Sequence, residues 1–207
     1  MIRSLIYNTL VRRLTAGWYA AVLRRLPDGA VLLDVGIGTA EALLANREQI
    51  QEKDLHITGI DIDADYVEHA VQAVQRANMA QRLQVRRESV HDHRGGPYDA
   101  VYFSGSFMLL PEPGRALRHC AELLKPGGRV YFTQTIQTRR SRAMETLKPL
   151  LKRFTTIDFG RVTYEDAFKA EIRAADLELV EFTILGRHGT RAYCLAVAAP
   201  QCVAPSA

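Results

Sequence analysis

Short apolar runs, each ending at a polar or glycine-containing turn, recur through the middle of the chain. They occupy residues 30–34, 55–61, 82–87, 98–103 and 129–133. Between them, apolar side chains return every three or four positions, which predicts helices with one buried face. A short continuous apolar run is typical of a strand that is buried on both faces of a parallel sheet. The alternation of the two patterns therefore predicts an α/β fold.

Two more strands are predicted near the carboxyl-terminal end, over residues 177–185 and 191–198. The connection between them, Gly186-Arg-His-Gly-Thr190, contains two glycines and is short enough for a hairpin. We therefore expect this last pair of strands to be antiparallel. The helices are predicted to begin at about residue 39 and to cover residues 64–78 and 114–124.

The turn after the first strand carries the candidate chemistry. It runs from Asp34 through Gly36, Ile37 and Gly38. Two glycines let the backbone turn sharply and approach a ligand closely, and the next helix directs its free N–H groups to the same place. These features predict a nucleotide-type cofactor site. A dinucleotide fingerprint would need a third glycine at the position of Glu41, whose carboxylate would repel a pyrophosphate.

A second acid, Asp61, ends the second strand about 20 residues past the glycine turn. An acid there can accept hydrogen bonds from both hydroxyls of a ribose. Ile62 would then offer an apolar surface to the adenine ring. The alternative interpretation is that Asp61 begins the next helix as a cap, a role we expect for Asp63.

The acid-x-Gly-x-Gly-x-small pattern from Asp34 to Ala40 resembles the first motif of the class I S-adenosylmethionine-dependent methyltransferases. That family usually has glycine where Ala40 stands. Leu-Lys-Pro-Gly-Gly at residues 124–128, followed by a strand, is frequent at the same place in the family. The resemblance covers roughly residues 30–198. It implies a Rossmann-like, seven-stranded, mostly parallel sheet with helices on both faces and an antiparallel last strand, and it implies S-adenosylmethionine as the cofactor.

The resemblance also assigns the loops after the third and fourth strands. In the family, the first of these loops lines the adenine, which places Ser89 and Val90 there, with Asp92 as the alternative in a shifted loop. The second loop flanks the methionine part of the cofactor and the reacting methyl group, which places Ser104 there. Phe107 follows and is either a wall of the substrate pocket or the first core-facing turn of the next helix.

The loop from Ser104 to Phe107 also narrows the substrate class. Methyltransferases that act on exocyclic amines of nucleobases commonly carry Asn-Pro-Pro-Tyr here, and this chain has Ser-Gly-Ser-Phe. A basic cluster over residues 139–153 has few interleaved aromatic residues, which also disfavours nucleic acid. Within that cluster, Arg139 could bind a carboxylate or phosphate of the acceptor, and the alternative is a solvated helix face.

The amino-terminal segment contains five arginines and no acid, with an apolar residue at every fourth position from Ile2 to Leu26. This pattern predicts one or two amphipathic helices, with a break near Gly17. Three interpretations remain open. The helix could be a lid over the cofactor mouth, with Tyr7, Trp18 or Tyr19 shielding the sulfonium or lining the acceptor pocket. It could instead lie on an anionic membrane surface, or be an organelle transit peptide.

Composition sets further limits. A chain of 207 residues with 47% apolar and 24% charged residues fits one soluble domain, with residues 1–28 as the lid and 29–200 as the catalytic core. Its three cysteines are scattered and show no metal-ligand spacing. We therefore expect no metal and no disulfide, and a cytoplasmic location that could include peripheral contact with a membrane. No apolar run approaches the length of a membrane span.

We therefore expect an enzyme that moves a methyl group from S-adenosylmethionine to a small or amphiphilic acceptor by in-line displacement. A sulfonium methyl is already activated, so positioning supplies most of the catalysis and no catalytic residue is assigned. His91, His93 and His188 are candidate bases for an acceptor that must lose a proton. The alternatives are a membrane-docking lipid or quinone methyltransferase, a NAD-dependent oxidoreductase on a similar sheet, and a non-catalytic cofactor-binding module. The sequence leaves the oligomeric state undetermined.

Overall fold

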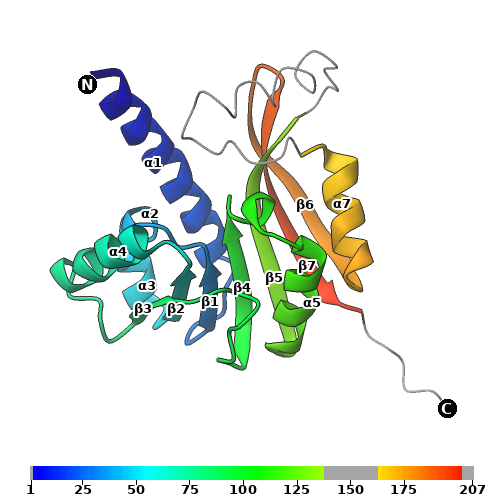
Figure 1. The fold of residues 1–207 in the computed structure, drawn as a ribbon, viewed down its shortest axis with the longest axis horizontal. Coiled ribbons are helices and arrows are strands. Elements are labelled where there is room, and N and C mark those ends of the chain that lie inside the picture. The colour runs from blue at the N-terminus through cyan, green and yellow to red at the C-terminus, as the bar shows by residue number, and fades with distance from the viewer. Residues whose placement is uncertain (1, 138–162, 202–207) are drawn as a thin grey trace.

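A single seven-stranded sheet organises the chain, with strand order β3-β2-β1-β4-β5-β7-β6 (Figure 1). The computed structural model describes residues 2–137 and 163–201. The strands are β1 (Val31–Val35), β2 (His56–Asp61), β3 (Leu83–Arg87), β4 (Tyr98–Ser104), β5 (Leu124–Gln137), β6 (Leu177–His188) and β7 (Arg191–Pro200).

Strands β1 to β5 pair in parallel, and β7 runs antiparallel to both of its neighbours, β5 and β6. The predicted seven-stranded, mostly parallel sheet with an antiparallel last strand is confirmed. The hairpin between β6 and β7 explains this arrangement, because a short connection can join only antiparallel neighbours.

Helices cover both faces of the sheet (Figure 1). The first face carries α1 (Ile2–Leu23), α2 (Glu41–Leu44), α3 (Arg47–Glu52) and α4 (Ala64–Arg76). The second face carries the short 3-10 helix η1 (Phe107–Leu109), α5 (Pro113–Glu122) and α7 (Glu165–Ala174). Each face has its own apolar core against the sheet.

Neighbouring residues of the central strands divide between these two cores. Tyr102 of β4 faces the α1 side, and Phe103 faces the α5 side. This division follows from the alternation of side chains along a strand. On the α5 side, Phe103, Phe107, Phe132 and Phe168 form an aromatic cluster with ring centroids 5.2 to 5.9 Å apart. Phe107 therefore takes the second of its two interpretations, the core-facing one.

Helix α1 is continuous through Gly17, and the predicted amphipathic character is not confirmed. Residues four apart on an α-helix are offset by about 40°, so the apolar series from Ile2 to Val22 winds roughly 200° around the axis and forms no single face. The carboxyl-terminal half is buried, with Trp18, Tyr19 and Val22 at 8%, 2% and 0% exposure. The amino-terminal half extends away from the sheet (Figure 1).

The end of α1 is fastened to the rest of the domain by Lys53, which follows α3. Its Nζ donates to three carbonyl oxygens in and after the last turn of the helix, those of Leu23, Arg24 and Leu26. Arg25 adds a two-pronged ion pair with Glu181 of β6, with nitrogen–oxygen distances of 2.7 and 3.2 Å. Helix α1 thus packs as part of the same structural unit as the sheet.

Candidate cofactor site

The carboxyl ends of β1, β2 and β4 meet at one edge of the sheet. Strand β1 lies between the other two, and all three run parallel. The chain moves outward from β1 in one direction through β2 and β3 and then in the other through β4 and β5. Ligands of open α/β sheets bind at such a reversal of strand order, outside the carboxyl ends.

The glycine turn after β1 depends on two positions with left-handed backbone. Gly36 has φ +77°, and a Cβ atom there would lie 2.5 Å from Cβ of Ser106. Only glycine therefore allows the loops after β1 and β4 to approach this closely. Gly38 has φ +58°, and no heavy atom of the described chain would lie within 4 Å of a Cβ there. The turn thus presents an open backbone surface at Gly38.

Ile37 sits between the two glycines and packs inward. It is 6% exposed, and its Cδ1 would lie 2.3 Å from a Cβ atom at Gly59 of β2. Its predicted role in cofactor binding is therefore restricted to the backbone.

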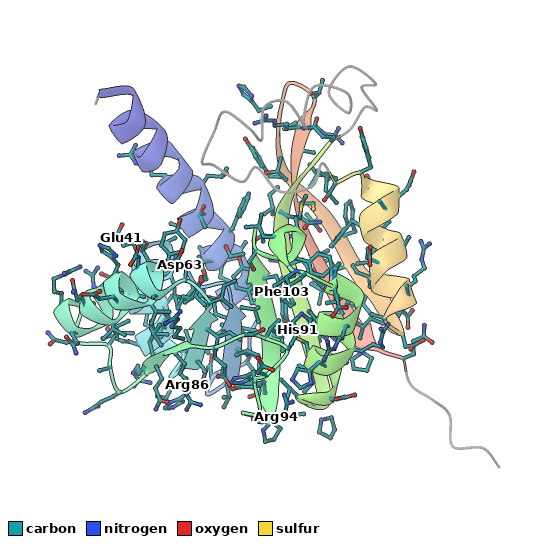
Figure 2. All side chains as sticks on the ribbon, viewed as in Figure 1. Glu41, Asp63, Arg86, His91, Arg94 and Phe103 are labelled. Carbon is teal, nitrogen blue, oxygen red and sulfur yellow. The ribbon has the colours of Figure 1, made fainter. Side chains whose placement is uncertain are left out.

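Asp61, the predicted ribose ligand, is hydrogen-bonded to the glycine turn. Its Oδ2 accepts a hydrogen bond from the Gly38 N–H at 3.0 Å, and its Oδ1 accepts one from the Asp63 N–H at 3.0 Å. Asp63 itself caps α4 (Figure 2) by accepting from the N–H groups two and three residues ahead, as predicted. Ile62 between them is 68% exposed and offers the apolar surface expected beside an adenine.

Asp34 is fully buried on the α1 face at the end of β1. Its Oδ2 accepts a hydrogen bond from the Tyr19 hydroxyl at 2.8 Å. Burial raises the pKa of Asp34 to about 7; the Tyr19 hydrogen bond opposes that rise, and the nearby Asp61 charge adds to it. The other oxygen, Oδ1, is buried without a partner among the described residues.

Two more polar atoms near the carboxyl ends of β1 and β4 are also buried without a partner among the described residues. Trp18 Nε1 and Ser104 Oγ are buried and have no hydrogen-bond partner in the described part of the chain. The Trp18 ring lies 3.6 Å from the position of a Cβ on Gly105, the residue after Ser104. Because buried polar groups in proteins are nearly always paired, these orphaned atoms are consistent with a polar ligand at this edge.

The loop after β3 holds the predicted adenine contacts. Ser89 is half-buried, and its Oγ accepts from the His91 N–H at 3.3 Å. Val90 is 4% exposed and packs into the core, so only its backbone is available to a ligand. Asp92 is exposed in the same loop.

A buried hydrogen-bonded triad fixes this loop. His93 is fully buried, with Nδ1 2.8 Å from Glu88 Oε2 and Nε2 2.7 Å from the Tyr98 hydroxyl. Both ring nitrogens are occupied by these contacts, which tie the loop after β3 to the start of β4. The positions of Glu88, His93 and Tyr98 along the sequence did not predict this triad, because only the folded loop brings the three side chains together. His91 Nε2 lies 3.1 Å from the Pro111 carbonyl oxygen, and His188 is exposed at the end of β6.

Known proteins that resemble this chain are consistent with a cofactor site of this kind. Residues 33–130, from β1 into β5, match the family described as "Methyltransferase domain". The match covers just under half of the chain, and it bears out the predicted resemblance to the methyltransferases that use S-adenosylmethionine.

One relative of the methyltransferase domain is the ubiquinone biosynthesis O-methyltransferase of Sodalis glossinidius. It is 32% identical over 108 residues, which are 51% of this chain and 41% of that protein. The chain thus spans less than half the length of this relative. The ubiquinone biosynthesis O-methyltransferase of Xanthomonas axonopodis is 31% identical over 54% of this chain and 46% of its own.

Solved structures show the same fold at low identity. A geranyl diphosphate methyltransferase in complex with the cofactor is 12% identical, with a TM-score of 0.70, over 90% of this chain and 85% of its own. The cyclase SpnF is 18% identical, with a TM-score of 0.71, over 91% of this chain and 81% of its own. Since a cyclase shares the fold, the reaction must be argued from the site.

The predicted acceptor contacts of the methyltransferase domain fall in different places. Tyr19 is turned inward onto Asp34 and is 2% exposed. Phe107 is 5% exposed inside the aromatic cluster. The side chain of Tyr7, and Arg139 altogether, lie outside the described residues. None of the four is shown to contact an acceptor.

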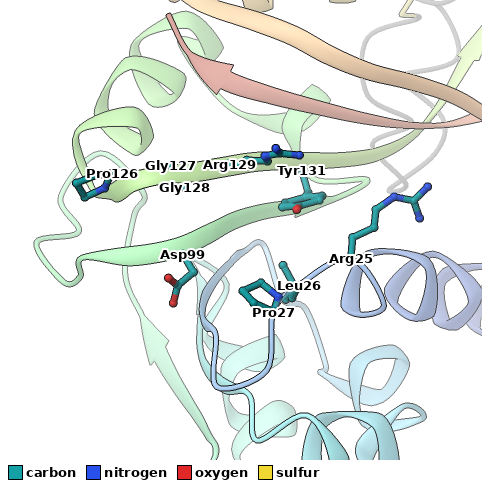
Figure 3. Close-up of a pocket in the computed structure, with 9 residues that line it drawn as sticks. All are labelled: Arg25, Leu26, Pro27, Asp99, Pro126, Gly127, Gly128, Arg129 and Tyr131. Atoms are coloured by element: carbon teal, nitrogen blue, oxygen red, sulfur yellow. The ribbon is translucent and has the colours of Figure 1, made fainter. Parts of the chain in front are cut away.

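A cavity of about 320 Å³ opens at the other edge of the sheet (Figure 3). Arg25, Asp99, Arg129 and Tyr131 are among the residues that line it, and they lie where β4 and β5 begin their pairing. No predicted cofactor residue lines this cavity, because the glycine turn and Asp61 lie at the carboxyl ends of parallel strands.

Residues 2–137 and 163–201 hold no cluster of three or more His, Cys, Asp or Glu side chains arranged to bind a metal. Over the same residues, no helix has the length and apolar character needed to cross a bilayer.

Proposed function

We propose that this chain binds S-adenosylmethionine at the carboxyl edge of β1, β2 and β4 and transfers its methyl group to a small or amphiphilic acceptor. The observation that carries the proposal is the joining of Asp61 to the Gly38 backbone. That hydrogen bond holds the Asp61 carboxylate, the proposed ribose ligand, against an open glycine turn at the reversal of strand order.

The residues present fit the cofactor in chemical kind. Asp61 would bind the ribose hydroxyls, Ile62 would lie against the adenine, and Ser89 with the Val90 backbone would contact the rim of the ring. Gly36 and Gly38 would bring the backbone close to the ligand. Asp34 and Ser104, each with a buried oxygen for which the described residues offer no geometric hydrogen bond, would hold the amino-acid end.

The bound cofactor supplies a methyl group already activated by a sulfonium. The protein therefore has to hold the acceptor in line with the breaking bond and exclude water, and well-oriented reactants can gain roughly 7 to 11 kcal/mol in this way. Residues 1–28 are proposed to cover the site and residues 29–200 to form the catalytic core. The buried carboxyl-terminal half of α1 supports this division, because it packs over the end of β1.

Cofactor affinity tests the proposal. Isothermal titration of S-adenosylhomocysteine, the demethylated product, should give at least about a tenfold weaker affinity for Asp61→Ala than for the wild type, because a charged acceptor is lost. Asp65→Ala is the matched control, since it removes an exposed acid of the same helix start and should leave affinity unchanged. Tight binding of NAD, or equal affinity of Asp61→Ala, would contradict the assignment.

A second candidate is a membrane-docking quinone methyltransferase. The names of the relatives from Sodalis and Xanthomonas favour it, and so does the extension of α1, with Arg13 exposed, away from the sheet. Flotation with phosphatidylglycerol vesicles should recover the wild type and lose Arg12→Ala/Arg13→Ala if the helix docks. Equal recovery of both proteins, or none of either, would remove the docking candidate. A screen for transfer of a tritiated methyl group onto pooled metabolites and lipids would then identify the acceptor.

A further inference from the structure

Tyr19 of α1 reaches the carboxyl ends of β1 and β4, where we propose that the cofactor binds. It lies one turn before the end of the helix, on the face that covers the sheet, and only 2% of it is exposed. The sequence suggested a pocket-lining aromatic residue, but the structure places its hydroxyl 2.8 Å from Asp34 Oδ2. This contact ties the amino-terminal helix to the first acid of the glycine motif.

The ring of Tyr19 is held in one orientation. It meets the ring of Tyr102 edge-on, with centroids 5.1 Å apart and planes at 89°. Tyr102 is the register partner of Asp34 across the β1–β4 pair, so both side chains lie on the same face of the sheet. Tyr102 is anchored in turn by its hydroxyl, 2.6 Å from Thr133 Oγ1 on β5. Packing thus holds the Tyr19 ring so that its hydroxyl donates to Asp34, with Ser104 also close enough to act on that hydroxyl.

The consequence is an asymmetric carboxylate. Oδ2 of Asp34 is occupied by Tyr19, whereas Oδ1 is buried and has no hydrogen-bond partner among the residues that the structure describes. A buried carboxylate oxygen without a partner is costly, and a cationic donor offsets that cost best. The amino-acid end of S-adenosylmethionine carries such a donor in its ammonium group.

We propose that Tyr19 is a positioning residue, which holds Asp34 so that Oδ1 alone faces the ammonium group of the bound cofactor. The inference rests on the function proposed above, and it adds a role for α1 that the glycine motif does not contain. Tyr19 acts through Asp34 and does not itself need to touch the ligand.

The positioning role of Tyr19 can be measured through the pKa of Asp34, which the surrounding groups shift. Tyr19 from α1, Tyr102 from β4 and Asp61 from β2 are the titratable groups that act on it. Burial, and then the Asp34 charge, raise the pKa of Tyr19 well above its usual value, so its hydroxyl stays protonated and donates. The same bond lowers the pKa of Asp34, which burial has raised to about 7. Loss of the hydroxyl should therefore raise the pKa of Asp34 further and reduce its charge near neutral pH.

The experiment compares two ligands across pH. Isothermal titration with S-adenosylhomocysteine, which has the amino-acid end, and with 5′-methylthioadenosine, which lacks it, is carried out between about pH 6 and 9. Tyr19→Phe should weaken S-adenosylhomocysteine binding about fivefold at pH 7, as expected if the pKa rises by about one unit and the ionised fraction falls from about a half to about a tenth. The midpoint of the pH profile should move upward, and 5′-methylthioadenosine affinity should not change.

Tyr102→Phe is the matched control, because it removes an equally buried hydroxyl on the same face whose partner is Thr133. It should leave the ratio of the two affinities at the wild-type value. In an Asp34→Asn background, Tyr19→Phe should have no further effect on that ratio, since the two residues act as one unit. This cycle also separates positioning from a general loss of folding, which would weaken both ligands together.

The outcomes are distinct. An unchanged affinity ratio in Tyr19→Phe, or an equal loss for both ligands, would overturn the positioning role while leaving the cofactor assignment intact. If the wild type binds neither ligand, the proposed function itself fails and the positioning role with it.

Discussion

Ala40 stands in left-handed backbone, with φ 59°, at the position where the family usually has glycine. It is 1% exposed, so its methyl group is packed in the core. The left-handed conformation also delays the helix that we expected from about residue 39, since α2 begins at Glu41 and lasts only four residues. Alanine can therefore replace the usual glycine here, at the cost of a strained backbone conformation at Ala40.

Ala40→Gly is accordingly expected to be nearly neutral for stability. The loss of a buried methyl group costs about 0.8 kcal/mol, and relief of the left-handed strain returns about 1 kcal/mol. Ala70→Gly is the control, because Ala70 is equally buried but lies inside α4, where glycine should cost about 1 to 2 kcal/mol. Urea denaturation of both variants measures the contrast, and equal destabilisation would contradict the strain argument.

Asp34 should make stability depend on pH. Its folded-state pKa of about 7 lies above the unfolded value of about 3.9, so the folded state keeps a proton that the unfolded state loses between about pH 4 and 7. The free energy of unfolding therefore falls as pH rises through that window. Each unit of difference corresponds to about 1.4 kcal/mol.

Asp34→Asn removes this titration, and its stability relative to the wild type should be higher at pH 8 than at pH 5. Chemical denaturation at both pH values measures the difference. Asp92→Asn, at an exposed acid, should show no such trend. A constant difference between Asp34→Asn and the wild type would mean that the buried carboxyl does not titrate in this range.

At the scale of elements, the patterns located the strands well and the helices less well. Strand β4 was predicted at residues 98–103 and spans Tyr98–Ser104, because apolar runs of this length have few other uses. Strand β5 was predicted at residues 129–133 and spans Leu124–Gln137, since its pairing with β4 begins at Leu124 and its pairing with β7 continues to Gln137. The amphipathic character predicted for α1 is not confirmed, because apolar positions spaced by four drift around a helix.

The docking of α1 should depend on Lys53, a residue with no place in any motif. Lys53→Met removes one charged donor from three carbonyl oxygens at the helix end and should cost about 1 kcal/mol after allowance for its partial exposure. Arg47→Met removes an exposed, loosely paired cation and should stay within about 0.5 kcal/mol. Urea denaturation measures the free energy of unfolding of both variants. Equal losses in Lys53→Met and Arg47→Met would show that the Lys53 hydrogen bonds do not stabilise the end of α1.

At the scale of the whole molecule, two sites lie at opposite ends of the parallel strands. One is at the carboxyl ends of β1, β2 and β4, where we propose that the cofactor binds, and the other is the cavity lined by Arg25 and Arg129. A ligand at the cofactor edge binds only the folded chain, so it should stabilise the protein in proportion to its concentration. At a hundredfold excess over its dissociation constant, S-adenosylhomocysteine should add about 2.7 kcal/mol, a rise in Tm of several degrees. NAD at the same concentration should add nothing measurable, and a comparable shift with NAD would reopen the oxidoreductase alternative.

The sequence by itself determined most of the strands and the positions of Asp34, Gly36, Gly38 and Asp61 along the chain. These rest on local chemistry, since apolar runs make buried strands and glycine permits the turn. The seven-stranded sheet and the family came from the resemblance that the glycine motif carries. The tertiary structure decided what those residues contact. It bonded Asp61 to Gly38, turned Tyr19 onto Asp34 and buried His93 between Glu88 and Tyr98. Such contacts join segments from different elements, and no periodicity along one segment records which side chain another will meet.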